Sequence, residues 1–320
     1  MTIYAGVIGL GIVSNRIIAQ FKEHEEIQLA AVCDVDETRV QNYTQNHSEV
    51  AGFTDYHKVI EMNHLDLVYV ATPPAFHAEI VTAAMEAGKH VLCEKPLAND
   101  MEEAAKMLEA AQASDKVHAL HFPLQYSDAM YEFEHLYHSG YLGELRRIEV
   151  VMQFPQWPRP WQQNAWVGGR KQGGYTLEVG VHFIQSIQRI FGPITDIAGT
   201  MTYPKDENAC EIAVLATGKL AFVRQTNNVE VLFNGFSGAG GRERVELNAY
   251  GTKGTISLQN WGKLLIGKLG EELTPVQPAH QTQTLMHHLI QAIHGKPAVL
   301  CDFQVGYDAQ RVLESLRGLA

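Results

Sequence analysis

Short apolar runs alternate with longer amphipathic segments over the first 120 residues of the chain. The runs predict strands, and the segments, with apolar positions three or four residues apart, predict helices. The expected strands are 3–8, 29–33, 67–71, 90–93 and 117–122, and the expected helices are 12–24, 37–46, 78–87 and 101–113. Strands that are apolar on both faces and alternate with helices predict a doubly wound parallel sheet, the Rossmann architecture.

The pattern changes after residue 121. Helices are expected at 128–139, 176–191, 282–294 and 303–317, and a strand at 147–154. Between 194 and 276, alternating strands and Gly-rich turns predict a large, mostly antiparallel open sheet. We therefore expect two domains, a dinucleotide-binding Rossmann domain over 1–121 and an α+β domain for substrate binding and oligomerisation over 122–320.

Composition supports two cores and excludes several kinds of partner. The 320 residues are 46% hydrophobic and 19% charged, which excludes disorder for most of the chain. The net charge of −11, without a basic block, argues against nucleic acid and anionic membranes. No apolar run approaches the roughly 20 residues of a membrane span, and no signal peptide is recognisable, so we expect a cytoplasmic protein.

The cysteines fit a reducing compartment. Cys33, Cys93, Cys210 and Cys301 form no C-x-x-C pair and lie among apolar residues, which predicts buried thiols. A reactive Cys93 is the alternative.

A glycine-rich loop follows the first expected strand and opens the first helix. Gly9 permits the tight turn and Gly11 lets the backbone approach a pyrophosphate, which the helix N-terminus attracts. Ile12 and Val13 complete the predicted cofactor contacts of this loop. Ser14 replaces a third glycine where helix and strand pack closely.

Asp34 ends the second strand, where an acidic residue binds the adenosine ribose hydroxyls. Its carboxylate, with Asp36 beside it, would repel a 2′-phosphate, so we predict NAD, with NADP less favoured. Arg39 could still accommodate the phosphate. The alternative is that Asp34 only caps the next helix.

Two further motifs stand at the ends of the third and fourth strands, Thr72-Pro73 with His77 and Glu94-Lys95-Pro96. With these the chain resembles the glucose-fructose oxidoreductase and inositol dehydrogenase (Gfo/Idh/MocA) family over essentially its whole length. The resemblance also rests on the glycine loop, Gly140-Tyr141-Leu142-Gly143-Glu144-Leu145, Gly173-Gly174, Gly180 with His182, and Tyr250-Gly251-Thr252-Lys253-Gly254.

The resemblance implies reversible hydride transfer between a nicotinamide and a carbinol carbon of a sugar, polyol or related diol. It assigns cofactor contacts to Thr72, Pro73, His77 and Glu94, and it maps the family's lysine onto Lys95, near the nicotinamide and the reacting hydroxyl. An alcohol releases hydride only if its proton leaves too, and a desolvated lysine can hydrogen-bond the oxygen and relay that proton.

A later helix departs from the family pattern. Where relatives have Asp, His and commonly a second Asp, this chain has Glu178, His182 and Gln185, which share one helix face at i, i+4 and i+7. His182 is the expected general acid/base, because imidazole titrates at about pH 6.5 when unperturbed. Glu178 is expected to orient it, Lys95 or a substrate hydroxyl. Gln185, and Gln125 where many relatives have arginine, are expected substrate contacts.

Several other groups carry alternatives. Trp157, Trp161 and Trp166 either stack on a sugar or form a packed loop, and Trp166, closest to the Gly-Gly turn, is the preferred substrate contact. The histidine groups at 135 and 138 and at 280, 287, 288 and 294 lack completing ligands, so no metal is expected.

The broad sheet predicts a homodimer or homotetramer. A catalytically silent nucleotide-binding regulator or sensor of the same fold is the alternative function.

Overall fold

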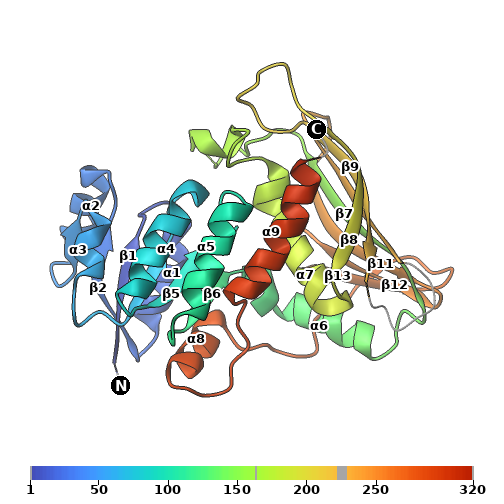
Figure 1. Cartoon of the computed structure of the whole chain (residues 1–320). Coiled ribbons are helices and arrows are strands. Elements are labelled where there is room, and N and C mark those ends of the chain that lie inside the picture. The colour runs from blue at the N-terminus through green and yellow to red at the C-terminus, as the bar shows by residue number, and fades with distance from the viewer. Residues whose placement is uncertain (1, 163, 222–228, 319–320) are drawn as a thin grey trace. The chain divides into compact units, whose positions relative to one another are not determined.

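The computed structural model describes residues 2–162, 164–221 and 229–318, which form two compact units (Figure 1). The first unit contains the residues up to His121 together with Thr284–Tyr307, and the second contains Phe122–Gln283 and the residues from Asp308 onward. In the described ranges, no helix has the length and apolarity to span a bilayer.

The first unit contains a six-stranded parallel sheet in the order β3-β2-β1-β4-β5-β6. Its strands are β1 (Ile3–Ile8), β2 (Ile27–Cys33), β3 (Ala51–Phe53), β4 (Leu67–Val70), β5 (His90–Glu94) and β6 (His118–His121). Its helices are α1 (Ser14–Glu23), α2 (Glu37–Thr44), α3 (Tyr56–Ile60), the 3₁₀ turn η1 (Pro74–Phe76), α4 (His77–Glu86), α5 (Met101–Gln112) and α8 (Leu285–Ile293). The predicted Rossmann class is confirmed, and the strand order reverses between β1 and β4, where this fold binds its ligand.

The sequence prediction missed β3 and α3. β3 has three residues, none of them fully buried, and α3 has five, so neither is long enough to establish a periodicity. The local signal for α3 was Asp55, whose side chain accepts a hydrogen bond from the His57 N–H and caps the helix.

Residues 284–307 pack in the first unit, whereas the boundary expected from the sequence, after residue 121, placed them in the second domain. Leu285, Leu289 and Ile290 of α8 are buried, and the Cys301 carbonyl accepts a hydrogen bond from the Leu120 N–H of β6. This bond satisfies a backbone group at the edge of the parallel sheet, which would otherwise be exposed.

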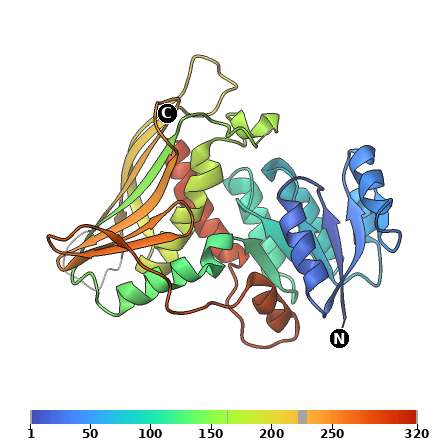
Figure 2. The same ribbon diagram turned by 180° about the vertical axis from the view of Figure 1, so that it is seen from behind.

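The second unit contains an eight-stranded sheet in the order β14-β13-β12-β11-β7-β10-β9-β8, seen from behind in Figure 2. Its strands are β7 (Leu145–Phe154), β8 (Ile194–Thr202), β9 (Ala213–Leu220), β10 (Glu230–Ser237), β11 (Arg244–Gly251), β12 (Gly254–Gln259), β13 (Lys263–Lys268) and β14 (Thr274–Pro275). β7 and β10 are parallel and all other described pairs are antiparallel, which confirms the predicted mostly antiparallel sheet. Part of the region predicted as strands and turns, 222–228, lies outside the described residues.

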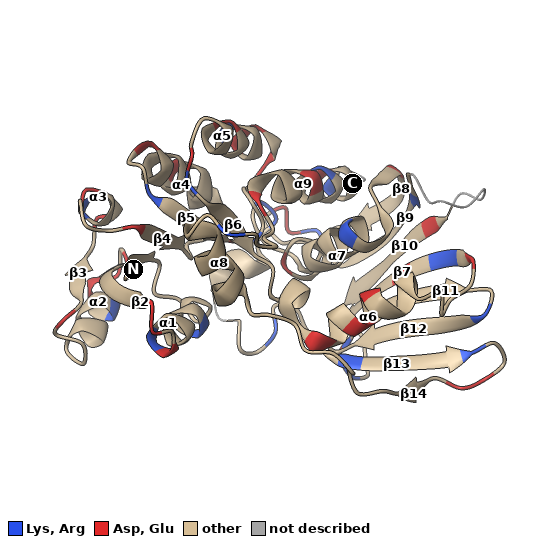
Figure 3. Cartoon of the chain, turned by 90° about the horizontal axis from the view of Figure 1, so that it is seen from below, with Lys and Arg blue, Asp and Glu red and all other residues tan. Residues whose placement is uncertain are grey.

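Helices cover one face of this sheet. The helical elements that begin in this unit are η2 (Pro123–Tyr126), α6 (Asp128–His138), η3 (Ala165–Gly168), η4 (Thr176–Gly180) and α7 (Val181–Phe191), and α9 (Phe303–Arg317) ends in it. Figure 3 shows α6 and α7 along one face of the sheet. Val245, Leu247 and Ala249 form a fully buried apolar row in β11, and Met152, the residue paired with Val245, lies against Gly180 of η4. The alternate positions of β11 carry Glu246 and Asn248 on the opposite face.

Candidate active site

The glycine loop after β1 has two glycines with different roles. Gly9 has φ +100, and a Cβ on it would lie 2.5 Å from the Ala71 carbonyl oxygen, so the fold itself requires glycine there. A Cβ on Gly11 would meet nothing within 4 Å. The side of the loop at Gly11 is therefore open, as a backbone that approaches a pyrophosphate must be.

The start of α1 has the character of an anion site. The loop turns into the helix at Ser14, which is fully buried and donates a hydrogen bond to the Gly11 carbonyl at 2.7 Å. Ile12 and Val13 are exposed at 52% and 43%, and no described side chain caps the helix. Free N–H groups at a helix N-terminus attract phosphate, and the exposed apolar side chains offer area for a bound molecule to cover.

Asp34 closes back onto this loop. Its carboxylate accepts hydrogen bonds from the Leu10 N–H at 2.7 Å and the Asp36 N–H at 2.9 Å. The cap of α2 is Asp36, whose side chain accepts from the Thr38 N–H, so the capping role considered for Asp34 belongs to its neighbour. Arg39 lies 3.4 Å from both carboxylates and is half-exposed.

The loops after β4 and β5 are joined by His77. Its Nε2 lies 2.9 Å from the Thr72 carbonyl and its Nδ1 lies 3.0 Å from the Pro96 carbonyl, in a fully buried site. Burial lowers the pKa of His77 against the opposing effect of these carbonyls. His77 thus braces the loop in which the hydroxyl of Thr72, beside Pro73, is buried without a partner among the described residues.

Glu94 at the end of β5 is held inside the first unit. Tyr69 donates a hydrogen bond to its Oε1 at 2.5 Å, and the Nδ1 of His121 lies 2.6 Å from the same oxygen. Burial alone would raise the pKa of Glu94, but His121, Tyr69 and the charge of Lys95 together lower it. The anchored carboxylate fixes the strand end from which the half-buried Lys95 follows.

The predicted helix over 176–191 is two elements in the structure. Thr176–Gly180 is a π-helical turn and α7 begins at Val181. Hydrogen bonds in a π-turn span five residues, so the turn is wider than in an α-helix, and such turns are frequent at functional sites. Glu178 is half-buried in this turn, while His182 and Gln185 are buried in α7.

Gln125 and Gln185, predicted as separate substrate contacts, bind each other. The Nε2 of Gln185 donates to the Oε1 of Gln125 at 2.9 Å, and both side chains are buried. The two side chains thus form a buried pair of neutral amides.

The tryptophans before the Gly-Gly turn differ in their environments, which bears on whether they form a packed loop or stack on a sugar. Trp157 is packed, since its indole N–H donates to the Val167 carbonyl and its ring contacts Phe154 edge-on. Trp161 is 51% exposed, and Trp166 is half-buried in η3. The packed-loop interpretation therefore holds for Trp157, and a substrate contact by Trp166 stays a prediction.

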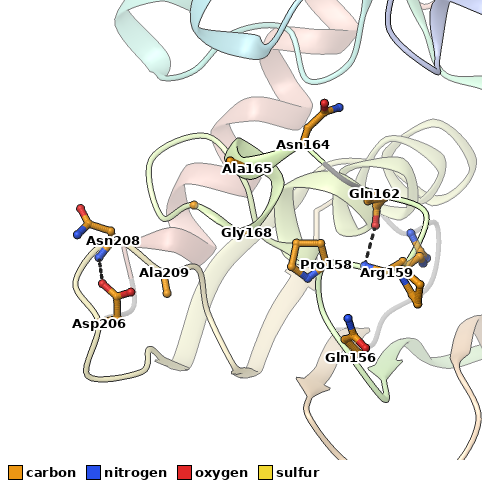
Figure 4. A pocket seen from close by; sticks show the side chains of 12 residues that line it. Gln156, Pro158, Arg159, Gln162, Asn164, Ala165, Gly168, Asp206, Asn208 and Ala209 are labelled. Atoms are coloured by element: carbon orange, nitrogen blue, oxygen red, sulfur yellow. Dashed lines mark hydrogen bonds between the residues drawn. The ribbon is translucent and has the colours of Figure 1, made fainter.

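A hollow of about 500 Å³ lies beside this loop in the second unit (Figure 4). Figure 4 shows Gln162 turned toward Arg159, whose main-chain N–H donates to the Gln162 side chain at 3.3 Å. The Arg159 guanidinium forms a two-pronged ion pair with Glu243. None of the site residues predicted from the sequence lines this hollow.

The histidines and cysteines considered for metal or thiol chemistry are also placed by the structure. No group of three or more His, Cys, Asp or Glu there could hold a metal ion, and His280 pairs instead with Glu132 at 3.0 Å. The four cysteines are unpaired and buried, as predicted. Cys93 is fully buried, and burial raises its pKa well above the ordinary value, which contradicts a reactive thiol.

Sequence reasoning missed two residues beside the π-turn and α7. Glu211 is buried and accepts a hydrogen bond from the Thr176 N–H at 2.7 Å, at the start of the π-turn. Trp261 contacts the ring of His182 from the turn between β12 and β13. Both lie far along the chain from the helix, so only the fold brings them to it.

Comparison with known proteins gives two matching family models. The model described as "Oxidoreductase family, NAD-binding Rossmann fold" matches residues 3–122, and the "GFO/IDH/MocA C-terminal domain" model matches residues 131–257. Together they span well over half of the chain.

Individual relatives are distant. Myo-inositol 2-dehydrogenase of Thermotoga maritima is 23% identical over 256 residues, which cover 80% of this chain and 75% of that protein. A solved oxidoreductase from Thermotoga maritima is similar with a TM-score of 0.85 at 21% identity, covering 100% of this chain and 97% of that one. A levoglucosan dehydrogenase in complex with NADH and L-sorbose has a TM-score of 0.82 at 17% identity, with coverages of 98% and 96%. These two structures establish the likeness of the fold.

Proposed function

The chain belongs to the GFO/IDH/MocA oxidoreductase family, and from this premise we propose that Lys95 and His182 manage the proton while hydride passes between NAD and a carbinol carbon of a sugar, polyol or related diol. Family membership confirms the predicted resemblance and the NAD-binding dehydrogenase class. The residue roles and the substrate are the proposal.

One observation carries the proposal: the chain has both a loop shaped to bind a dinucleotide and two side chains, Lys95 and His182, that can transfer a proton. The open side of Gly11, the uncapped helix start and the buried Thr72 hydroxyl fit a dinucleotide. When NAD is bound, its nicotinamide ring accepts hydride from the carbinol carbon. A regulator that had lost the chemistry would have no reason to keep Lys95 and His182.

The chain's own residues handle the proton. The Lys95 ammonium hydrogen-bonds the substrate oxygen and polarises it, and His182 accepts the hydroxyl proton in oxidation and returns it in reduction. Glu178, four residues before His182 and half-buried, orients the imidazole or a substrate hydroxyl. Lys95 belongs to the first unit and His182 to the second.

Cofactor choice follows from the acidic end of β2. Asp34 and Asp36 stand where the ribose hydroxyls of NAD would bind and would repel the additional phosphate of NADP. Arg39 is the residue through which NADP would be tolerated, and its position between the two carboxylates weakens it in that role.

Substrate class is supported by the similarity to myo-inositol 2-dehydrogenase of Thermotoga maritima and by the buried polar side chains of α7. The Gln125–Gln185 pair adds no net charge, which suits a neutral polyol better than a sugar acid. We place Trp166 at the sugar face.

Assembly and location are further parts of the proposal. The face of the second sheet away from α6 and α7 carries Leu215, which is 58% exposed, opposite Asn234 of the neighbouring strand and two residues along from Leu232. A second copy of the chain covering this face would give the homodimer or homotetramer. The four unpaired cysteines support a reducing, cytoplasmic setting.

The test is NADH formation with a panel of inositols, aldoses and linear polyols. We expect turnover with NAD on at least one of them, and its loss in Lys95→Ala and His182→Gln with NADH binding retained. NADH binding without turnover on any panel member would instead favour the silent regulator.

A further inference from the structure

The turn between β12 and β13 has an unusual backbone. Asn260 and Trp261 both have positive φ, +48 and +71, in consecutive positions. Asparagine tolerates this left-handed region, but a bulky aromatic residue rarely adopts it, and such a conformation persists only where surrounding contacts require it. The turn is held by the Asn260 N–H, which donates to the Val245 carbonyl at 2.8 Å.

The turn delivers the indole of Trp261 to α7. The indole stacks on Phe183, with ring centroids 5.6 Å apart and planes 22° from parallel, and meets His182 edge-to-face at 5.4 Å and 87°. Phe122 meets the same imidazole at 5.7 Å and 90°. Two aromatic rings therefore contact the imidazole nearly perpendicular to its plane, and all four residues belong to the second unit.

The burial of these rings differs. Phe183 and Phe122 are each 1% exposed, as core residues are, whereas Trp261 is only half-buried. Trp261 makes two ring contacts, the stack on Phe183 and the edge-to-face contact with His182. The second of these reaches the proposed acid/base.

We propose that Trp261 is a positioning residue for His182, fixing the plane of the imidazole so that its proton-exchanging nitrogen points in one direction. This inference rests on the proposed role of His182 as acid/base. An imidazole released from this contact samples other ring orientations, and misplacement of a catalytic group by about 1 Å costs roughly 100-fold in rate.

Kinetics of three variants test the positioning. Trp261→Leu is expected to lower kcat by about 10- to 100-fold while both KM values stay within about threefold, and Trp261→Phe, which keeps a ring, should recover part of the loss. Tyr141→Leu, an aromatic-to-aliphatic change elsewhere in the second unit, is the control and should leave kcat unchanged. A large rise in KM at constant kcat would make Trp261 a substrate contact, and unchanged kinetics would make it a packing residue. Either result overturns the proposal.

A double-mutant cycle on the free energy of unfolding tests the contact separately from turnover. Trp261→Leu should change this free energy by different amounts in the wild type and in His182→Gln, because the effects of two residues in contact are not additive. If the two effects add, the rings do not interact and the inference fails. If they do not add but no substrate is turned over, the proposed function has failed and Trp261 has no reaction to support.

Discussion

Gly9 and Gly11 are two residues apart, yet the structure predicts opposite consequences for the same substitution. An alanine at Gly9 would place its Cβ 2.5 Å from the Ala71 carbonyl oxygen and would have to adopt φ +100. An alanine at Gly11 would meet nothing within 4 Å and needs no left-handed backbone. Gly9→Ala should therefore damage the fold, and Gly11→Ala should damage only cofactor binding.

The magnitudes separate the two effects. For Gly9→Ala, about 1–2 kcal/mol for the left-handed backbone and about 1–3 kcal/mol for the overlap give a loss of about 2–5 kcal/mol. In a protein of this size that corresponds to a fall in Tm of roughly 5–15 °C. Gly11→Ala should leave Tm unchanged or slightly raised, because it restricts the unfolded chain. Its methyl group would displace a phosphate from the loop N–H groups, which weakens NADH binding by about 10- to 100-fold in Kd.

Thermal unfolding without cofactor and NADH fluorescence titration measure the two quantities on the same preparations. Wild-type NADH affinity in a stable Gly11→Ala variant would refute the reasoning, because it would mean that the pyrophosphate does not lie against Gly11. A Gly9→Ala variant with the wild-type Tm would show that the loop has room that the structure excludes.

Four further predictions concern the first unit and the thiols. The pKa of Glu94 lies below its ordinary value of 4.5, so its ionised form contributes fully to stability above about pH 4.5. This contribution is lost as the pH falls through the lowered pKa. In Glu94→Gln, a plot of Tm against pH should therefore fall less steeply on the acid side. Removing its partner in His121→Leu leaves a buried charge and should cost about 3–5 kcal/mol in thermal or urea unfolding. Lys95→Ala should lower turnover by orders of magnitude with NADH affinity within roughly tenfold, and a near-normal rate would remove Lys95 from the mechanism. Burial raises the pKa of Cys33 and of Cys210 to about 12, so native protein should resist iodoacetamide at about pH 8 while urea-unfolded protein is labelled, as mass spectrometry would measure.

The order of strands and helices in the first 120 residues could be predicted because each element is long enough to display its period. β3 and α3 could not, because five or fewer residues carry no period. The return of residues 284–307 to the first unit depends on contacts across more than 160 positions, which a single sequence does not reveal. The π-turn escaped because five residues at the start of a helix are too few to display a period of their own.

Residue types at the candidate site were readable from the sequence, but the directions of their side chains were not. Polar residues at strand ends predicted a site, yet His77 and Glu94 turn inward to brace the loops. Gln125 and Gln185 drew attention as departures from the family, and only their 2.9 Å hydrogen bond makes them a pair. Trp261 lies in no recognisable sequence motif. Its contact with His182 arises because the sheet places the turn between β12 and β13 against α7.

The hydrogen bond between Leu120 and Cys301 limits how the protein can be dissected. A fragment cut after residue 121 would end at a bare β6 edge and would lack α8, so it should self-associate through that edge. Obtaining a well-behaved nucleotide-binding fragment would require splicing residues 284–307 back on through a linker. For the same reason, recombination at a single point in the gene would not transfer the whole first unit to another protein, because this unit is built from two segments of the chain.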